Sequence, residues 1–184
     1  ADASCRDIKG RTCFHYLAHI YAQGMEIPEN PKYSLNQREA IVRLLASVYP
    51  AADINQKDNQ GIPPIVYLID GKNRRICSAL IGTFLEKGAD PYFVDNAGGT
   101  LLLIAIIDGQ ITASLLLMKY KDLVNQATKR GTTPILAAAN LREEGLCIAL
   151  KDHGAQGICE LADVDTINLA RIANNAFGDA FGQK

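Results

Sequence analysis

The chain has 184 residues, of which 48% are hydrophobic and 21% charged, and its formal net charge is -1. This is the composition of an ordinary globular domain and not of a disordered chain. A charge near zero disfavours a strongly basic nucleic-acid-binding protein and a polybasic membrane-surface protein. The longest apolar run, Leu101 to Ile107, is far shorter than the roughly 20 residues that span a bilayer, so we expect no membrane insertion.

The cysteines also restrict the class of protein. Five are present, spread along the chain without a C-x-x-C motif: Cys5, Cys13, Cys77, Cys147 and Cys159. An odd number with wide spacing predicts neither a disulfide framework nor a zinc ribbon. We expect scattered buried thiols in a reducing, cytoplasmic compartment. The chain starts without Met or a signal-peptide pattern, which is compatible with a fragment excised from a longer protein.

Four segments of the chain align with one another, and each begins at a glycine. They start at Gly10, Gly61, Gly98 and Gly131 and read GRTCFHYLA, GIPPIVYLI, GGTLLLIAI and GTTPILAAA. A second landmark follows each segment: ADIN at 52–55, GADPY at 88–92, LVN at 123–125 and GAQ at 154–156. Self-similarity at a spacing of this size is typical of repeat proteins.

This pattern resembles the ankyrin repeat, a unit of about 33 residues formed by a β-turn and two antiparallel helices. The resemblance implies an all-α solenoid of stacked helix-turn-helix units with β-turn connections, forming one domain over residues 1–184. We expect the repeats at about 7–55, 58–92, 95–125 and 128–156, and a C-terminal capping unit at about 157–177. Stacking would bury the apolar faces that a single repeat leaves exposed.

Helical spacing of apolar residues predicts the second helix of the first two repeats. The stripes are Ile41, Leu44, Leu45 and Val48 in repeat one, and Cys77, Leu80, Ile81, Phe84 and Leu85 in repeat two. Thr133 is expected to cap a first helix with Pro134 in its first turn. Gly88 and Gly154 fall where a helix ends in a left-handed residue.

One position of the template holds a histidine that, in the family, supports the turn by hydrogen bonds. Only repeat one keeps it, as His15. Val66, Leu103 and Leu136 occupy the position in the other repeats, and we expect their side chains to fill it by packing.

Two insertions separate the first and second helices of repeats one and two. The first covers about 21–36 and contains the apolar side chains of Tyr21, Met25, Ile27 and Tyr33. The second covers about 71–75 and is basic, with Arg74 among its residues. Insertions at the same point of adjacent repeats emerge on one face, which is often a binding face. The alternative is that both are tolerated surface loops.

Little in the sequence points to catalysis or to a cofactor. Cys13, His15 and His19 are the nearest approach to a metal site, but zinc needs three or four ligands and His15 has a role in the turn. No nucleotide-binding motif and no activated nucleophile are found, and the basic residues are too divided for nucleic-acid binding. We therefore predict no enzyme activity and no cofactor. Asn55 is a minor candidate for asparaginyl hydroxylation, as occurs in some ankyrin domains.

The resemblance implies a concave groove formed by the turn tips and the exposed side of the first helices. The residues predicted to contact a partner, together with those of the insertions, are Asp58, Asn59, Ile62, Asp70, Asp95, Asn96, Ile107, Asp108, Lys129, Arg130 and Asn140. The centre of this groove is acidic and its repeat-four end is basic. This charge distribution favours a protein or peptide partner with a basic segment.

The function that the resemblance implies is a monomeric, non-catalytic protein–protein interaction module or scaffold. Two alternatives remain open at this point. The chain could be the targeting or substrate-recruiting portion of a larger enzyme, or a pathogen effector acting in a host cytosol. A metal-dependent catalyst around Cys13, His15 and His19 is a third candidate of a different class.

Overall fold

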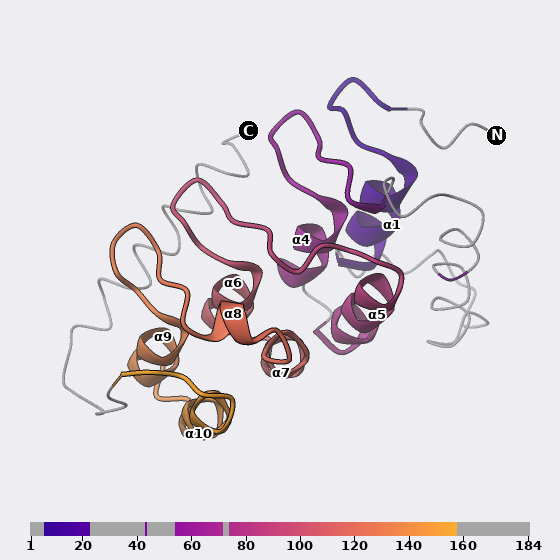
Figure 1. Cartoon of the computed structure of the whole chain (residues 1–184). Coiled ribbons are helices and arrows are strands. Elements are labelled where there is room, and N and C mark those ends of the chain that lie inside the picture. Colours follow the sequence, from indigo (N-terminus) through magenta and orange to yellow (C-terminus); the bar gives the residue numbers. More distant parts are fainter. Residues whose placement is uncertain (1–5, 23–42, 44–53, 72–73, 158–184) are drawn as a thin grey trace. The chain divides into compact units, whose positions relative to one another are not determined.

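A computed structural model describes residues 6–22, 43, 54–71 and 74–157, drawn as the coloured ribbon in Figure 1. The chain divides into two compact units, unit 1 (Ala1–Asp90) and unit 2 (Pro91–Lys184). This boundary lies two residues before the end of the predicted second repeat, 58–92. Over the described residues the regular structure is helical, with one isolated antiparallel bridge between Val94 and Thr100 and no strand. The all-α prediction is confirmed for this part of the chain.

Unit 1 contains three described helices: α1 (Cys13–Ala22), α4 (Pro64–Ile69) and α5 (Arg74–Glu86). Each packs against the other two, and the rings of Phe14 and Phe84 meet edge to face at 6.1 Å between centroids. Four of the five residues of the predicted stripe of repeat two face this core, because Cys77, Leu80, Ile81 and Phe84 are fully buried, and the fifth, Leu85, is half-buried. The stripe predicted for repeat one at 41–48 lies outside the described residues, apart from residue 43.

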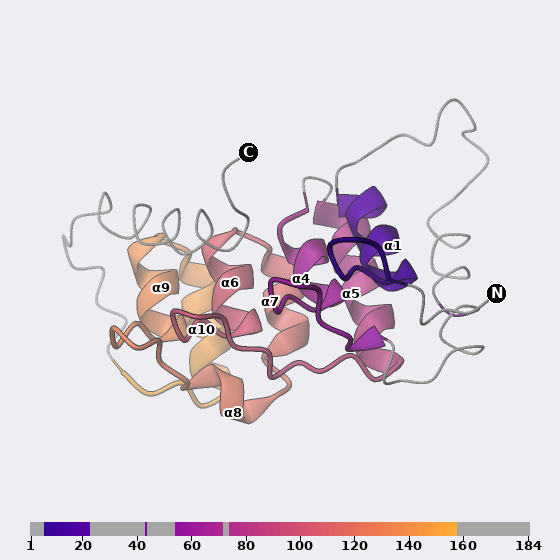
Figure 2. The ribbon, with the colours of Figure 1, turned by 90° about the horizontal axis from the view of Figure 1, so that it is seen from above.

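Unit 2 contains five described helices: α6 (Leu101–Ile107), α7 (Ile111–Leu117), α8 (Lys121–Val124), α9 (Pro134–Asn140) and α10 (Glu144–Asp152). Helix α6 packs against α7 and α9, and α10 packs against α9 and α7. Figures 1 and 2 both show these four helices side by side. Helices of seven to nine residues are too short to be stable alone, so their stability comes from this packing. The short helix α8 is an element that the repeat pattern did not predict.

The helix ends follow the local sequence signals. Thr133 accepts a hydrogen bond from the N–H of Leu136, and Pro134 occupies the first turn of α9, as predicted. Gly88 and Gly154 have φ angles of 91° and 89°, which L-amino acids with a side chain rarely adopt. These predictions are confirmed. The predicted capping unit lies outside the described residues, except for Gly157.

The apolar replacements of the template histidine behave in two ways. Val66 and Leu103 are buried, as expected, but the prediction is wrong for Leu136, whose side chain is 42% exposed. The equivalent His15 reaches a carbonyl oxygen of the next turn along the chain. Repeat four is followed by no described turn, because the described residues end at 157, so nothing described covers Leu136 on that side.

Candidate functional site

Four turns, one at the start of each predicted repeat, share one backbone geometry. Their first residues are Asp7, Asp58, Asp95 and Thr128, and their fourth residues are Gly10, Gly61, Gly98 and Gly131. In each turn the N–H of the first residue donates to the carbonyl oxygen of the fifth, and the N–H of the glycine donates back to the carbonyl oxygen of the first, over 2.9–3.1 Å. The glycines have φ between 75° and 84°, which explains why every repeat contains one there.

The side chain of the first residue completes each turn. The Oδ1 atom of Asp95 accepts hydrogen bonds from the N–H groups of Ala97 and Gly99, at 2.8 and 2.6 Å. The Oδ1 atoms of Asp58 and Asp7 likewise accept from the N–H groups of the residues two and four positions later in the chain. Thr128 accepts the equivalent two bonds with its hydroxyl oxygen. Such side-chain bonds to the backbone are typical of Asp and Thr in turns. The aspartates are therefore structural parts of the turns.

Three residues predicted on the partner-binding surface are buried. Tyr21, Asp58 and Ile62 are 4%, 8% and 5% exposed, so the prediction that their side chains face solvent is wrong. Tyr21 lies in the last turn of α1 rather than in an insertion loop. The carbonyl oxygen of Ile62 accepts a hydrogen bond from His15, which holds this residue beneath the first turn.

The remaining predicted residues differ in exposure. Those that are exposed are Asn59, Asp70, Arg74, Asn96, Lys129 and Arg130, and those that are half-buried are Asp95, Ile107, Asp108 and Asn140. Met25, Ile27 and Tyr33 lie outside the described residues. Arg74 begins α5, so at least this part of the second insertion is helical. Two of the four carboxylates predicted for the acidic centre of the groove, Asp58 and Asp95, are engaged in turns and keep their charge there.

Neighbouring turns within a unit are joined by hydrogen bonds that the sequence did not reveal. In unit 1, Asn59 donates from its backbone N–H to the carbonyl oxygen of Lys9 at 2.9 Å and from Nδ2 to that of Ile8 at 3.0 Å. In unit 2, Lys129 donates from its backbone N–H to Ala97 and from Nζ to Asn96, at 3.0 and 2.8 Å. These bonds fix the relative position of the two turn tips in each unit.

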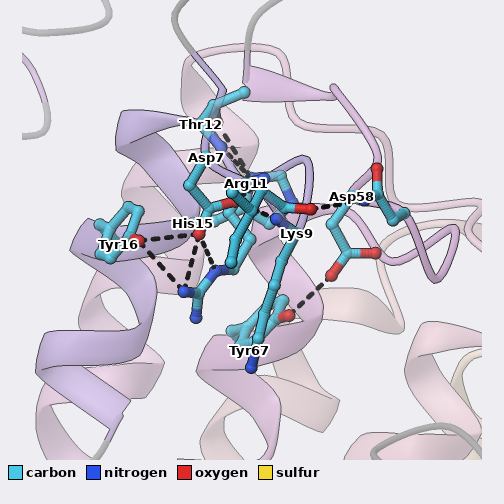
Figure 3. Close-up of polar contacts among 10 residues, drawn as sticks. Asp7, Lys9, Arg11, Thr12, His15, Tyr16, Asp58 and Tyr67 are labelled. Carbon is cyan, nitrogen blue, oxygen red and sulfur yellow. Dashed lines mark hydrogen bonds and ion pairs between the residues drawn. The ribbon is translucent and has the colours of Figure 1, made fainter.

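An ionic cluster surrounds the first turn and is shown in Figure 3. Arg11 pairs with Asp7 at 2.8 Å, and its guanidinium carbon lies 4.7 Å from the ring centroid of Tyr16. The Tyr16 hydroxyl donates to Oδ2 of Asp7 at 2.8 Å. Partial desolvation opposes it, but hydrogen bonds from Arg11, Tyr16 and Lys9 hold the pKa of the Asp7 carboxyl well below its usual range. The carboxylate thus stays ionised and engaged within the turn.

His15 supports two turns at once. The backbone N–H of Thr12 donates to its Nδ1 at 3.0 Å, and its Nε2 lies 2.9 Å from the carbonyl oxygen of Ile62. Because Nδ1 accepts a bond from an N–H group, the proton must be on Nε2, and the ring is neutral. Burial lowers the pKa of His15, even though the bond to Ile62 opposes the shift. This arrangement agrees with the turn-supporting role that the family resemblance implied.

The same bonds occupy both ring nitrogens of His15, which leaves neither for a metal. Among the residues that the structure describes, no three His, Cys, Asp or Glu side chains are grouped to hold a metal ion. His19 lies beside Tyr67, with the two rings edge to face at 6.0 Å, and burial together with the charges of Arg11 and Lys9 lowers its pKa. Nothing in this geometry supports the metal-site alternative.

Asn55 connects successive landmarks of the repeats. Its Nδ2 donates to the carbonyl oxygen of Gly88 at 2.7 Å, and its Oδ1 accepts from the N–H of Asp90 at 2.7 Å. Asn125 repeats the pattern in unit 2, donating to the carbonyl oxygen of Gly154 and accepting from the N–H of Gln156. The amide of Asn55 is thus a structural connector between the two landmarks.

Comparisons with known proteins agree with the repeated turns. No family model matches the chain. It is 30% identical over 109 residues to the ankyrin repeat protein L371 of Acanthamoeba polyphaga mimivirus, covering 59% of this chain and 14% of that protein. It is 26% identical over 146 residues to Rabankyrin-5 of Mus musculus, covering 78% of this chain and 11% of that protein. These names indicate ankyrin-like repeats at low identity, and the chain spans less than a sixth of either relative.

A solved structure is similar in fold. It contains the Bd0816 predatory endopeptidase of Bdellovibrio bacteriovorus in complex with the immunity protein Bd3460. The match has a TM-score of 0.60 and 20% sequence identity, and it covers 97% of this chain and 83% of the matched chain. At this identity the likeness concerns the fold alone. Over the described residues, no helix combines the length and apolarity needed to cross a membrane.

Proposed function

We propose that the chain is a non-catalytic protein-interaction module built from ankyrin-type repeats, stacked as a solenoid. The observation that carries this proposal is the set of four equivalent turns, each closed by its own Asp or Thr and by a left-handed glycine. Repetition of one local geometry is a way to display side chains at regular intervals for recognition. The ankyrin-named relatives support the same function, as does a fold neighbour that comes from a complex of two proteins.

The display surface in unit 2 consists of the turn tips and one side of the first helices. Asn96, Lys129 and Arg130 are exposed at the tips, and Asp108 and Asn140 are half-buried at the ends of α6 and α9. The bond from Lys129 to Asn96 holds the two tips together before any partner binds. A surface that is ordered in advance loses little conformational entropy on association.

The proposed module acts without a cofactor and as a monomer. Three of its described ionisable groups serve the fold: Asp7 and Asp58 close turns, and His15 joins two of them. A catalytic constellation would need such groups to converge on a space that admits a substrate. The purified chain is expected to elute as a monomer in size-exclusion chromatography with light scattering.

Affinity capture with the intact chain tests the proposal. We expect specific host or cellular proteins to be enriched over a blank resin, and Arg130→Glu to reduce that enrichment because Arg130 is an exposed tip residue. Lys151→Glu is the matched control, since Lys151 is an exposed basic residue on α10 away from the tips. Deletion of residues 24–34 examines the first insertion in the same assay. Failure of the intact chain to enrich any protein would overturn the proposal.

A second candidate is that the module recruits substrates for a larger protein, such as an enzyme or an effector. The observation that favours it is that both sequence relatives are several times longer than the aligned region. If the reading frame extends beyond these 184 residues, the test is to compare the partners that the chain captures with those that the longer protein captures. Identical partners with and without the flanking sequence would support recruitment by this module.

A further inference from the structure

The turns of unit 1 leave one sign of charge at their surface. Arg6, Lys9 and Lys57 are exposed, and Arg11 is half-buried beside Tyr16. We call these four residues the basic edge. The two carboxylates of the unit 1 turns, Asp7 and Asp58, are directed into their own turns by hydrogen bonds. The turn tips of unit 1 are therefore basic, although Asp70 at the end of α4 remains exposed.

The basic edge is held in place by bonds between the two turns. Asn59 binds the carbonyl oxygens of both Ile8 and Lys9, and Nη1 of Arg6 lies 3.4 Å from the carbonyl oxygen of Lys57. These contacts use backbone oxygens, so the ammonium groups of Lys9 and Lys57 are not needed to form them. The charges of Lys9 and Lys57 are thus carried on a fixed frame that does not need them, whereas Arg6 and Arg11 also contribute bonds to it.

The electrostatics at His19, on the neighbouring helix, agree with a positive field. Besides burial, the charges of Arg11 and Lys9 lower the pKa of His19. Arg11 and Arg6 act in the same direction on His15, where the carboxylate of Asp58 opposes them. Both histidines belong to α1, which directly follows the first turn. Three of the four residues of the basic edge therefore act on the same helix, as expected if they lie near one another.

One exposed apolar side chain, Ile8, is next in the chain to Lys9 of the basic edge. Ile8 is 95% exposed, although its carbonyl oxygen is fixed by Asn59. An exposed aliphatic side chain on an ordered turn, next to Lys9 in the chain, is suited to a ligand that combines carboxylates with an apolar group. Nucleic acid fits less well, because the exposed aromatic ring nearby, Tyr16, is covered on one face by Arg11 and is bonded to Asp7.

We propose that the basic edge binds an acidic segment of the partner protein, one that carries an aliphatic side chain to contact Ile8. This inference rests on the proposed function, since it names the chemistry of the partner. It also reverses the charge of the partner that the sequence favoured. Electrostatic attraction of this kind makes binding strongly dependent on ionic strength.

The probe for this proposal is a fluorescein-labelled peptide of alternating Glu and Leu, with a peptide of alternating Lys and Leu as the control. Fluorescence anisotropy with the intact chain is expected to show binding of the Glu peptide that weakens as salt rises. The double variant Lys9→Glu/Lys57→Glu should weaken it about tenfold, because two attractive charges become repulsive. Lys119→Glu/Lys151→Glu, which reverses two exposed lysines of unit 2, should change it less than twofold.

Other outcomes would overturn the proposal. Equal binding of the Glu and Lys peptides, or unchanged binding by the Lys9/Lys57 variant, would show that the basic edge does not select acidic segments. Tighter binding of a single-stranded oligonucleotide than of the Glu peptide, lost in the same variant, would assign the edge to nucleic acid. An unchanged unfolding curve of the variant ensures that a loss of binding is not a loss of fold.

The failure of this inference can be separated from failure of the proposed function. If the intact chain captures a protein partner and the Lys9/Lys57 variant captures it equally well, the interaction function stands and the basic edge is not its site. If the intact chain captures no partner, the proposed function itself fails. If the variant alone loses the partner, both are supported.

Discussion

The hydroxyl of Tyr67 donates a hydrogen bond to Oδ2 of Asp58 at 2.7 Å, and the residue pair is nine positions apart. Tyr16 and Asp7 form the same bond at the same separation. In both pairs the other carboxylate oxygen closes the turn, so one aspartate joins a turn to the helix that follows it. Repeat three has Ile104 at the corresponding position. This connection is therefore a property of the turns of unit 1.

Removing the Tyr67 hydroxyl should destabilise unit 1 more than removing that of Tyr16. Tyr67→Phe leaves a buried carboxylate oxygen of Asp58 without its donor, which costs about 1–3 kcal/mol of unfolding free energy. Tyr16→Phe costs less, because Arg11 still donates to the same oxygen of Asp7. Urea unfolding of the two variants measures the difference. Equal losses would contradict the role assigned to burial.

From its bonds in the structure, we expect Asp95 to act as a turn residue and not as a partner-binding charge. Asp95→Ala removes the acceptor for two backbone N–H groups and should cost about 1–3 kcal/mol. Asp95→Asn retains the Oδ1 acceptor and should recover most of that loss. Asp152→Ala, at the exposed C-terminal end of α10, should cost about 0.5 kcal/mol or less. If Asn proves as damaging as Ala, the negative charge matters and the turn assignment is wrong.

Two turn glycines of unit 2 offer a matched pair. Gly98 and Gly131 have φ of 84° and 83°, so alanine at either position costs about 1–2 kcal/mol in backbone strain. A Cβ at Gly98 would lie 2.8 Å from the backbone nitrogen of Lys129, whereas a Cβ at Gly131 would meet nothing within 4 Å. Gly98→Ala should therefore be more destabilising by about 1–3 kcal/mol. Thermal or urea unfolding measures this difference, and equal losses would contradict the tight contact between the two turns.

His15 should make stability depend on pH. Burial lowers the pKa of this histidine below its ordinary value of 6.5, so the unfolded chain binds the proton more readily than the folded one. The free energy of unfolding that neutral His15 contributes is fully present above about pH 6.5. It is lost as the pH falls through and below that value. Protonation of Nδ1 would also oppose the N–H of Thr12.

The comparison that isolates this effect is His15→Gln. We expect the variant to be less stable than the wild type at pH 7.5 and to lose less stability between pH 7.5 and 5. His19, whose pKa is lowered in the same direction, leaves part of the pH dependence in place. Parallel pH profiles for the two proteins would show that His15 is not the group responsible.

Much of the local structure was predictable because it depends on residues a few positions apart. The stripe ending at Phe84, the cap at Thr133 and the left-handed Gly88 all follow from spacing or from the conformational freedom of single residues. The exposure of side chains was less predictable. Tyr21 is in a helix that runs longer than the template, and Asn59 gains its role from Ile8, which lies 51 residues away.

The sequence by itself determined that the chain is helical, that four turns recur and where their glycines fall, since these features are written in local patterns. Only the tertiary structure decided which charges remain available to a partner. In the sequence, Asp58 and Asp95 look the same as any surface aspartate. In the structure, their carboxylates accept hydrogen bonds from backbone N–H groups of their own turns. Lys9, whose side chain serves no such bond, keeps its charge at the surface, because a cation cannot accept a hydrogen bond from a backbone N–H.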